Sequence, residues 1–247
     1  MVNVRLVFIG KNPPELDVRN VTSWKSDLFK IYPEVRYPLN LTPDIYPWGY
    51  SDVYLSKNLP SVAKVTQQTK DNQKTDLTFY IIDAPLENNW LSRIIEPNRI
   101  VVTFYEAKDI LKKEYIPFEN YIIQNLYFYS LLFVKAGTGI ITMDDELNMV
   151  HGARRCCVFD MCGLKEEMVD SCIEPILCTS CKKQLENVDE NLLMKVEQEL
   201  KGLKRSSYYK MALFLKAHPW WSLIASLVAA IVCGVLGSFI YQGLIGQ

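Results

Sequence analysis

The most restrictive feature of the sequence is an unbroken apolar run close to its C-terminus. From Trp220 to Ile245, 26 consecutive residues include no Asp, Glu, Lys or Arg. At about 1.5 Å of rise per residue, a helix of this length exceeds the roughly 30 Å hydrocarbon core of a bilayer. Trp221 and Tyr241 lie near the ends of the run, where aromatic side chains meet lipid headgroups. The run therefore predicts a single C-terminal transmembrane helix over residues 219–245, and a buried core helix is the disfavoured alternative.

Charge is distributed unevenly around this run. No acidic residue follows Glu199, whereas five basic residues do: Lys201, Lys204, Arg205, Lys210 and Lys216. Because positive charge marks the cytoplasmic side of a span, we expect residues 1–216 in the cytoplasm and the span in the cell inner membrane. The basic residues should face lipid headgroups and attract anionic lipid. The soluble part has no basic stripe with interleaved aromatic residues, so direct nucleic-acid binding is not expected.

Cysteine usage indicates a metal site. Of the seven cysteines, Cys233 lies inside the apolar run and the other six lie between residues 156 and 181. A reducing cytosol disfavours a disulfide framework, so such clustering indicates metal ligands. Cys178 and Cys181 form a Cys-x2-Cys pair, in which one tight turn offers two thiolates at the spacing that tetrahedral Zn²⁺ accepts.

The other two ligands have several candidates. His151 is the one histidine besides His218, which stands beside the apolar run, and we expect His151 and Cys157 to complete the site. Cys156 and Cys162 are the alternatives. A catalytic zinc keeps one position open, so four protein ligands predict a structural Zn²⁺. The predicted ligand set is His151, Cys157, Cys178 and Cys181. The competing interpretation is that the thiols are small buried hydrophobic side chains.

Apolar periodicity predicts an α/β or α+β domain in front of the span. Strands are expected at Val4–Ile9, Leu77–Ile82 and Arg99–Phe104. Helices are expected at Val21–Ile31, Glu106–Lys112 and Glu119–Lys135. The last of these helices is apolar nearly all round, which indicates that it is buried.

Other segments predict loops and a connecting stalk. Residues 32–60 are rich in Pro and aromatic residues and predict an ordered loop, and Thr66–Lys74 predicts an exposed polar loop. Asp189 is expected to cap a helix that runs to about Lys204, and Tyr208–Ala217 then leads into the membrane.

These elements give three parts. A cytosolic, zinc-stabilised domain is expected at residues 1–185, with its zinc-binding segment at 151–181. A basic helical stalk follows at 189–217, and the transmembrane helix at 219–245.

The cysteine segment resembles a motif of the archaemetzincins. The sequence reads His151-Gly152-x4-Cys157-x-Phe159, then 18 residues, then Cys178-x2-Cys181. In that family an HExxHxxGxxH helix ends in His-Cys-x4-Cys-x-Met-x17-Cys-x2-Cys, whose cysteines hold a structural zinc. Here Gly152 stands in place of the first cysteine, which leaves His151 as the fourth ligand. The upstream order of strands and a long helix is also similar to a small metzincin, so the resemblance implies such a fold for residues 1–185.

The catalytic part of that motif is missing. Counting back from His151, the positions for His, Glu, His and Gly hold Ile141, Thr142, Asp145 and Asn148. Zinc hydrolysis needs three ligands, a bound water and a general base, and the carboxylates Asp144, Asp145 and Glu146 have no imidazoles to complete such a site. The resemblance therefore implies a pseudopeptidase without catalytic residues.

Other enzyme chemistry has little sequence support. The motifs GxxxxGK[ST], GxGxxG and GxSxG do not occur. A Cys157 nucleophile with His151 as its base is an alternative that shared metal binding explains better. Asp83, Glu87 and Arg93 are candidates for lining a pocket, although an ion-paired surface is the simpler interpretation.

Small residues recur every fourth position along the span: Ser222, Ser226, Ala230, Gly234 and Ser238. Such a row lets two helix backbones approach closely and favours association in lipid. We expect a homo-oligomer that assembles through this face.

Two classes of function remain. In the first, the chain is a non-catalytic membrane effector, whose spans assemble and perturb the bilayer when a cytosolic sensor engages the domain. This architecture resembles transmembrane effectors of prokaryotic antiviral systems, including those associated with Argonautes, which implies an Argonaute-like partner. In the second, the chain is a tail-anchored adaptor that recruits a cytosolic partner to the membrane. A membrane-bound zinc hydrolase is a third alternative.

Overall fold

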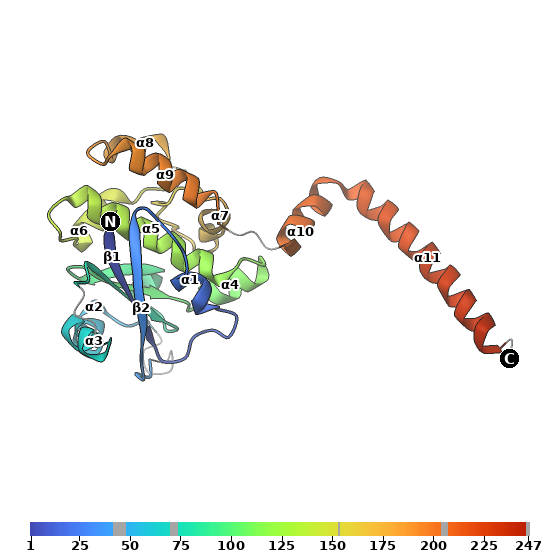
Figure 1. Cartoon of the computed structure of the whole chain (residues 1–247), viewed down its shortest axis with the longest axis horizontal. Helices are drawn as coiled ribbons and strands as arrows, with labels where there is room; N and C mark the ends of the chain where they lie inside the picture. Colours follow the sequence, from blue (N-terminus) through green and yellow to red (C-terminus); the bar gives the residue numbers. More distant parts are fainter. Residues whose placement is uncertain (42–47, 70–73, 153, 204–206, 246–247) are drawn as a thin grey trace. The chain divides into compact units, whose positions relative to one another are not determined.

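The computed structural model of the chain describes residues 1–41, 48–69, 74–152, 154–203 and 207–245. By its internal contacts the chain forms two compact units, Met1–Lys204 and Arg205–Gln247 (Figure 1).

The first unit is built on a five-stranded sheet. The strands are β1 (Val2–Ile9), β2 (Phe29–Tyr37), β3 (Leu77–Ile82), β4 (Ser92–Glu96) and β5 (Arg99–Thr103). They lie in the order β2-β1-β3-β5-β4, and only β4 runs antiparallel to its neighbour. The central strands β1, β3 and β5 are buried along nearly their whole length. Burial on both faces explains why they are continuous apolar runs rather than alternating ones.

Helices cover both faces of this sheet. The long helix α5 (Phe118–Ala136) and the short α1 (Val18–Thr22) lie on one face, and α2 (Asp52–Asn58) and α3 (Val62–Thr69) lie on the other (Figure 1). Two neighbouring residues of β3 illustrate the division, because successive side chains of a strand point to opposite faces. Phe79 packs edge to face against Tyr129 of α5, whereas Tyr80 lies in a cluster with Leu55 of α2.

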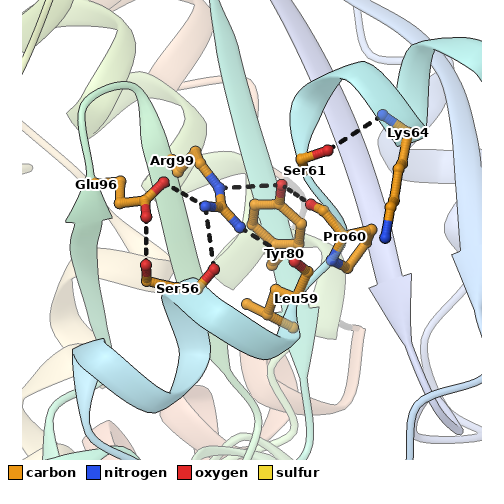
Figure 2. A network of polar contacts seen from close by, with 8 residues as sticks. All are labelled: Ser56, Leu59, Pro60, Ser61, Lys64, Tyr80, Glu96 and Arg99. Carbon is orange, nitrogen blue, oxygen red and sulfur yellow. Dashed lines mark hydrogen bonds and ion pairs between the residues drawn. The ribbon is translucent and has the colours of Figure 1, made fainter.

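A buried arginine fastens α2 to the sheet (Figure 2). Arg99, at the start of β5, donates through Nη1 to the carbonyl of Ser56 and through Nη2 to that of Leu59, both at 3.4 Å. Tyr80 Oη accepts from Arg99 Nε at 3.3 Å and donates to the carbonyl of Pro60 at 2.7 Å. The last carbonyls of a helix lack partners within the helix, so these bonds satisfy the end of α2 and fix its position.

The C-terminal half of the first unit consists of short helices around α5. They are α4 (Ala107–Lys113), α6 (Met143–Met149), α7 (Met168–Ile173), α8 (Thr179–Gln184) and α9 (Glu190–Leu200), with a single 3₁₀ turn at Lys165–Glu167. Another 3₁₀ turn, Glu87–Asn89, lies between β3 and β4. Asp189 caps α9 as expected, because its side chain accepts from the backbone N–H of Asn191. The helix expected at Glu119–Lys135 is α5, and it is buried over most of its length.

Helix α9 belongs to the globular unit rather than to a free stalk. Val196 and Leu200 are buried on it. Glu199 accepts three hydrogen bonds, from Ser26 Oγ at 2.7 Å, the backbone N–H of Asp27 at 2.8 Å and Tyr127 Oη at 2.6 Å. The segment predicted as a stalk at 189–217 is thus divided between the two units.

Three expectations for local structure were wrong. The helix expected at Val21–Ile31 ends at Thr22, and Phe29 begins β2, because parallel pairing with β1 outweighs the helical spacing of the apolar residues. Residues 32–60 include the rest of β2 and all of α2, while residues 42–47 lie outside the described part. Pro33 is compatible with β2 because this strand is at the edge of the sheet. Of Thr66–Lys74, the first four residues belong to α3, and residues 70–73 are not described.

The second unit contains α10 (Ser207–Ala217) and α11 (Pro219–Ile245). Pro219 begins α11, where proline is favoured because its missing N–H would have no partner inside the helix. By length and composition α11 could cross a membrane, and none of its most apolar stretch, Pro219–Ser238, is buried against the rest of the chain.

Candidate metal centre

Two backbone bridges and the helix α8 position the four predicted metal ligands within residues 151–181. The backbone of His151 donates to the carbonyl of Phe159 at 3.1 Å and accepts from the N–H of Met161 at 2.9 Å. Cys157 lies in a second bridge, opposite Ile176. The two bridges bring His151 and Cys157 to the same place although their side chains are six positions apart.

Helix α8 supplies the other two thiols. Cys178 stands at its N-cap, and its sulfur accepts a hydrogen bond from the backbone N–H of Cys181 at 3.5 Å. The first turn of the helix therefore presents both sulfurs of the Cys-x2-Cys pair to one side. Cys157 and Cys181 are fully buried, Cys178 nearly so, and His151 is half-buried.

The four side chains converge on one point. The ligand atoms of His151, Cys157, Cys178 and Cys181 all lie within 4.8 Å of one another. Nε2 of His151 is 3.1 Å from Sγ of Cys181 and 3.4 Å from Sγ of Cys178, and the sulfurs of Cys157 and Cys181 are 3.7 Å apart. A tetrahedron with metal–sulfur distances of about 2.3 Å has edges of about 3.8 Å. The four residues are thus close enough to hold a metal ion, and the spacing is compatible with zinc.

One thiol of the cluster is also prepared for ionisation. A hydrogen bond with Cys181 lowers the pKa of Cys157 to about 5, and backbone contacts with Cys178 and Phe159 act in the same direction. The contact with Cys157 raises the pKa of Cys181. One thiolate is therefore already favoured at neutral pH, and the thiolate is the form that binds a metal.

The alternative cysteines do not join this cluster. Cys156 and Cys162 are half-buried residues with backbone φ angles of 68° and 48°, and neither belongs to the group of converging ligands among the described residues. Burial raises the pKa of Cys162 to about 12, so its thiol stays protonated at neutral pH. Cys172 is buried in α7, where burial also raises its pKa.

The positions that correspond to the catalytic motif have a structural role. Thr142 caps α6, and Asp145 completes a capping box by accepting from the backbone N–H of Thr142 at 2.8 Å. Ile141 is fully buried. In the described part of the chain, no second group of His, Cys, Asp and Glu converges around them.

The predicted charge cluster at Asp83, Glu87 and Arg93 is not one site. Asp83 pairs with Lys108 at 2.6 Å and Arg93 with Asp52 at 2.9 Å. The simpler interpretation, an ion-paired surface, describes these contacts.

A cavity of about 450 Å³ adjoins the metal centre. The lining comes from three segments: residues 160–163 with two residues of α7, residues of α5, which we call its floor, and residues 88–92, which end in β4. Glu146 of α6 also lines it: its carboxylate accepts from the backbone N–H of Ile94 at 3.0 Å and from Tyr129 Oη at 2.8 Å. Burial raises the pKa of Glu146 to about 7. Sequence reasoning missed this cavity, because lining residues such as Asn88 and Ser171 are 83 positions apart in the chain.

The row of small residues lies along α11. Ser226 Oγ donates to the carbonyl of Leu223 at 2.8 Å and Ser238 Oγ to that of Gly234 at 3.0 Å, so both hydroxyls are satisfied within the helix. A Cβ added at Gly234 meets nothing of this chain within 4 Å. Ala230 is exposed, and the side chain of Ser222 is not among those described.

The expected basic residues are distributed over both units. Lys201 follows α9 in the first unit, and Lys210 and Lys216 are exposed on α10 in the second. Lys204 and Arg205 lie outside the described residues.

The archaemetzincin resemblance rests on the cysteine segment and on the upstream order of elements, and it stays a prediction. No protein-family model, no curated protein and no solved structure matches this chain.

Proposed function

We propose that His151, Cys157, Cys178 and Cys181 bind one structural Zn²⁺, and that the chain is a non-catalytic membrane effector. The observation that carries the first part is the convergence of one imidazole and three thiols with near-tetrahedral spacing. All four positions of a tetrahedral ion would be protein side chains, which leaves none for a water or a substrate. The ion would therefore fold the 151–181 segment rather than catalyse a reaction.

Elemental analysis of the purified full chain in detergent tests the zinc proposal. We expect one zinc per chain, retained through gel filtration, and loss of folded structure on prolonged chelation because metal binding and folding are coupled. A metal-free chain that keeps its cooperative thermal transition contradicts this proposal.

The effector proposal is supported by the properties of α11. It is 27 residues long with no acidic or basic residue, and its apolar stretch is not buried in this chain. A lipid bilayer would supply the apolar environment that the described part of the chain does not provide for this stretch. The small-residue row adds a face on which identical spans can pack closely, and Ser226 and Ser238 bring no unsatisfied hydroxyl to it. Engagement of the first unit by a sensor would then concentrate the spans, and an Argonaute-like sensor in antiviral defence is the partner that the architecture suggests.

One substitution separates an effector from an adaptor. Gly234→Ile places bulk where two backbones would meet, and we expect it to weaken association by on the order of 1 kcal/mol or more. Val232→Phe, on the opposite side of α11, is the control. Oligomers are measured by cross-linking in lipid nanodiscs, and membrane potential by a dye in cells that express the chain.

Under the effector proposal, Gly234→Ile abolishes both the oligomers and any loss of membrane potential, while Val232→Phe retains them. A chain that stays monomeric in lipid, even with its partner engaged, refutes the effector. The adaptor function then remains, in which α11 only anchors the first unit.

A further inference from the structure

The cavity beside the metal centre presents hydrogen-bond acceptors on its floor. Gln124 and Asn125 of α5 both line it. Gln124 Nε2 donates to the carbonyl of Val158 at 2.9 Å, and Asn125 Nδ2 donates to the carbonyl of Tyr121 at 2.8 Å. A carbonyl can only accept, so these bonds fix which end of each amide is the nitrogen. The two amide oxygens accept no hydrogen bond from any residue that the structure describes.

The lining is also negatively charged. Two of the lining residues that the structure describes have carboxyl groups, Glu146 and Asp160, and none is Lys or Arg. Burial raises the pKa of Glu146 to about 7, so the negative charge of the lining comes mainly from Asp160. The Asp160 side chain is fully buried, and its Oδ2 has no hydrogen-bond partner. Arg155 reaches the other oxygen, Oδ1, at 3.4 Å, but this guanidinium also pairs with Glu167 and does not line the cavity. In an interior of low dielectric, such buried charges act strongly on a ligand.

The remaining walls are apolar and aromatic. Trp90 and Leu91 form one side, Phe128 the floor, and Met161 and Met168 the other side. The volume of about 450 Å³ is within the range of small-molecule sites, which are mostly apolar with a few well-placed polar groups.

The wall at Met161 is attached directly to the metal centre. The backbone N–H of Met161 donates to the carbonyl of the ligand His151 at 2.9 Å. The backbone N–H of Asp160 donates to the carbonyl of the ligand Cys157, also at 2.9 Å. Ser171 of α7 donates through Oγ to the same Cys157 carbonyl at 3.3 Å. The four-ligand cluster therefore positions one side of the cavity.

From these contacts we propose that the cavity binds a small organic cation, with an amine, amidine or guanidine group on an apolar or aromatic body. The cationic N–H groups donate to the free oxygens of Gln124 and Asn125 within the field of the buried Asp160 carboxylate. The apolar body packs between Trp90 and the two methionines. Anionic ligands such as phosphates and carboxylic acids should bind poorly, because no described lining residue is Lys or Arg. The nearby guanidinium of Arg93, over the ring of Trp90, is already paired with Asp52 at 2.9 Å. This site is independent of the membrane role of α11.

Three isosteric probes test the chemistry: benzamidine, which is a cation, benzamide, which is neutral, and benzoate, which is an anion. Binding to the zinc-loaded full chain in detergent is measured by saturation-transfer NMR and titration calorimetry. We expect benzamidine to bind at least about tenfold more tightly than benzamide, because charge-assisted hydrogen bonds are the stronger ones. Benzoate should show no binding. Equal binding of the three probes, or none by benzamidine, overturns the proposal.

Two variants locate the site. Met161 is 49% exposed, so Met161→Trp can fill the mouth of the cavity without disturbing the core, and it should weaken benzamidine binding at least about tenfold. Met194→Trp makes the same change at a residue of α9 that is 55% exposed and does not line the cavity, and it should leave binding unchanged. The melting temperature of each variant confirms that it is folded. Benzamidine binding that survives Met161→Trp in a folded chain places the cation elsewhere and refutes this site.

Discussion

At the scale of single residues, the metal centre depends on Cys178 more directly than on its neighbouring cysteines. Cys178 supplies both a ligand and the N-cap of α8. We expect Cys178→Ser to lose the metal and to destabilise the first unit, since ligand loss removes metal-coupled folding energy. Zinc content and thermal unfolding of the full chain in detergent provide the measurement.

Cys156→Ser is the matched control for that substitution. Cys156 is the immediate neighbour of the ligand Cys157 but does not converge with the cluster. The Cys156→Ser variant should retain one zinc per chain. If Cys156→Ser loses the metal as readily as Cys178→Ser, the ligand set is wrong.

Glu146 gives the first unit a characteristic pH dependence. Burial raises its pKa from 4.5 to about 7. Between these values the folded chain holds a proton that the unfolded chain releases, so the free energy of unfolding should fall as pH rises through this window. The full effect is at most about 3 kcal/mol. In Glu146→Gln the free energy of unfolding should vary less over this pH window, because the amide does not titrate. The variant should still fold, since the amide can accept from Ile94 and donate to the oxygen of Tyr129.

The test compares the slope of unfolding free energy against pH between wild type and Glu146→Gln, because zinc binding depends on pH in both proteins. Denaturant unfolding is followed from pH 5 to pH 8. Asp144→Asn, at an exposed position of the same helix, is the control. The same slope in wild type and Glu146→Gln would show that the carboxyl does not hold a proton in the folded state.

At the scale of elements, docking of α9 depends on one carboxylate. Glu199 accepts from three donors in the segment before β2 and in α5, whereas the helix buries few apolar residues. Glu199→Gln should cost about 2 kcal/mol, the value of hydrogen bonds to a charged group. Amide hydrogen exchange should then speed up in residues 190–200 more than elsewhere, and the control Glu190→Gln, at an exposed position, should not change it. Exchange that rises evenly over the first unit contradicts local undocking.

The strands that were predicted correctly from the sequence are those that are buried along nearly their whole length. The strand at Leu77–Ile82 has the predicted bounds because it is buried on both faces, so its apolar run is continuous. β4 was missed because only two isoleucines stand between its polar ends, and pairing with β5 makes it a strand. The first three residues of β2, Phe29–Ile31, were assigned to a helix because apolar residues there also fit helical spacing, and the rest of β2 was assigned to the loop at residues 32–60. Long-range pairing, which one sequence does not reveal, decided both cases.

The cluster of His151 and three cysteines was predictable for a different reason. Cys178 and Cys181 are a local pair, and one histidine was available to complete the set. The choice of Cys157 over Cys156 agreed with the cysteine spacing of the resemblance, and in the structure Cys157 is buried in the bridge opposite Ile176. The cavity could not be predicted, because Gln124 and Asn125 become acceptors only when their nitrogens meet particular carbonyls of the folded chain.

At the scale of the whole molecule, we expect charge to set the orientation of α11 in a membrane. Lys210 and Lys216 lie within the stretch before the span where basic residues control topology. The double variant Lys210→Glu, Lys216→Glu should reduce the fraction of chains with the first unit in the cytoplasm. Protease added outside bacterial spheroplasts reports this fraction, because it reaches only chains whose first unit has been translocated.

A control with the same change of net charge is needed, since total charge also affects membrane insertion. Lys57→Glu with Lys64→Glu provides it, because both residues are exposed on α2 and α3, far from the span in sequence. If only the pair on α10 changes protease sensitivity, charge next to the span sets the orientation. If both pairs act equally, net charge of the chain is responsible. If neither acts, the folded first unit itself resists translocation and the basic residues serve only to attract anionic lipid, at about 1 kcal/mol per charge near the surface.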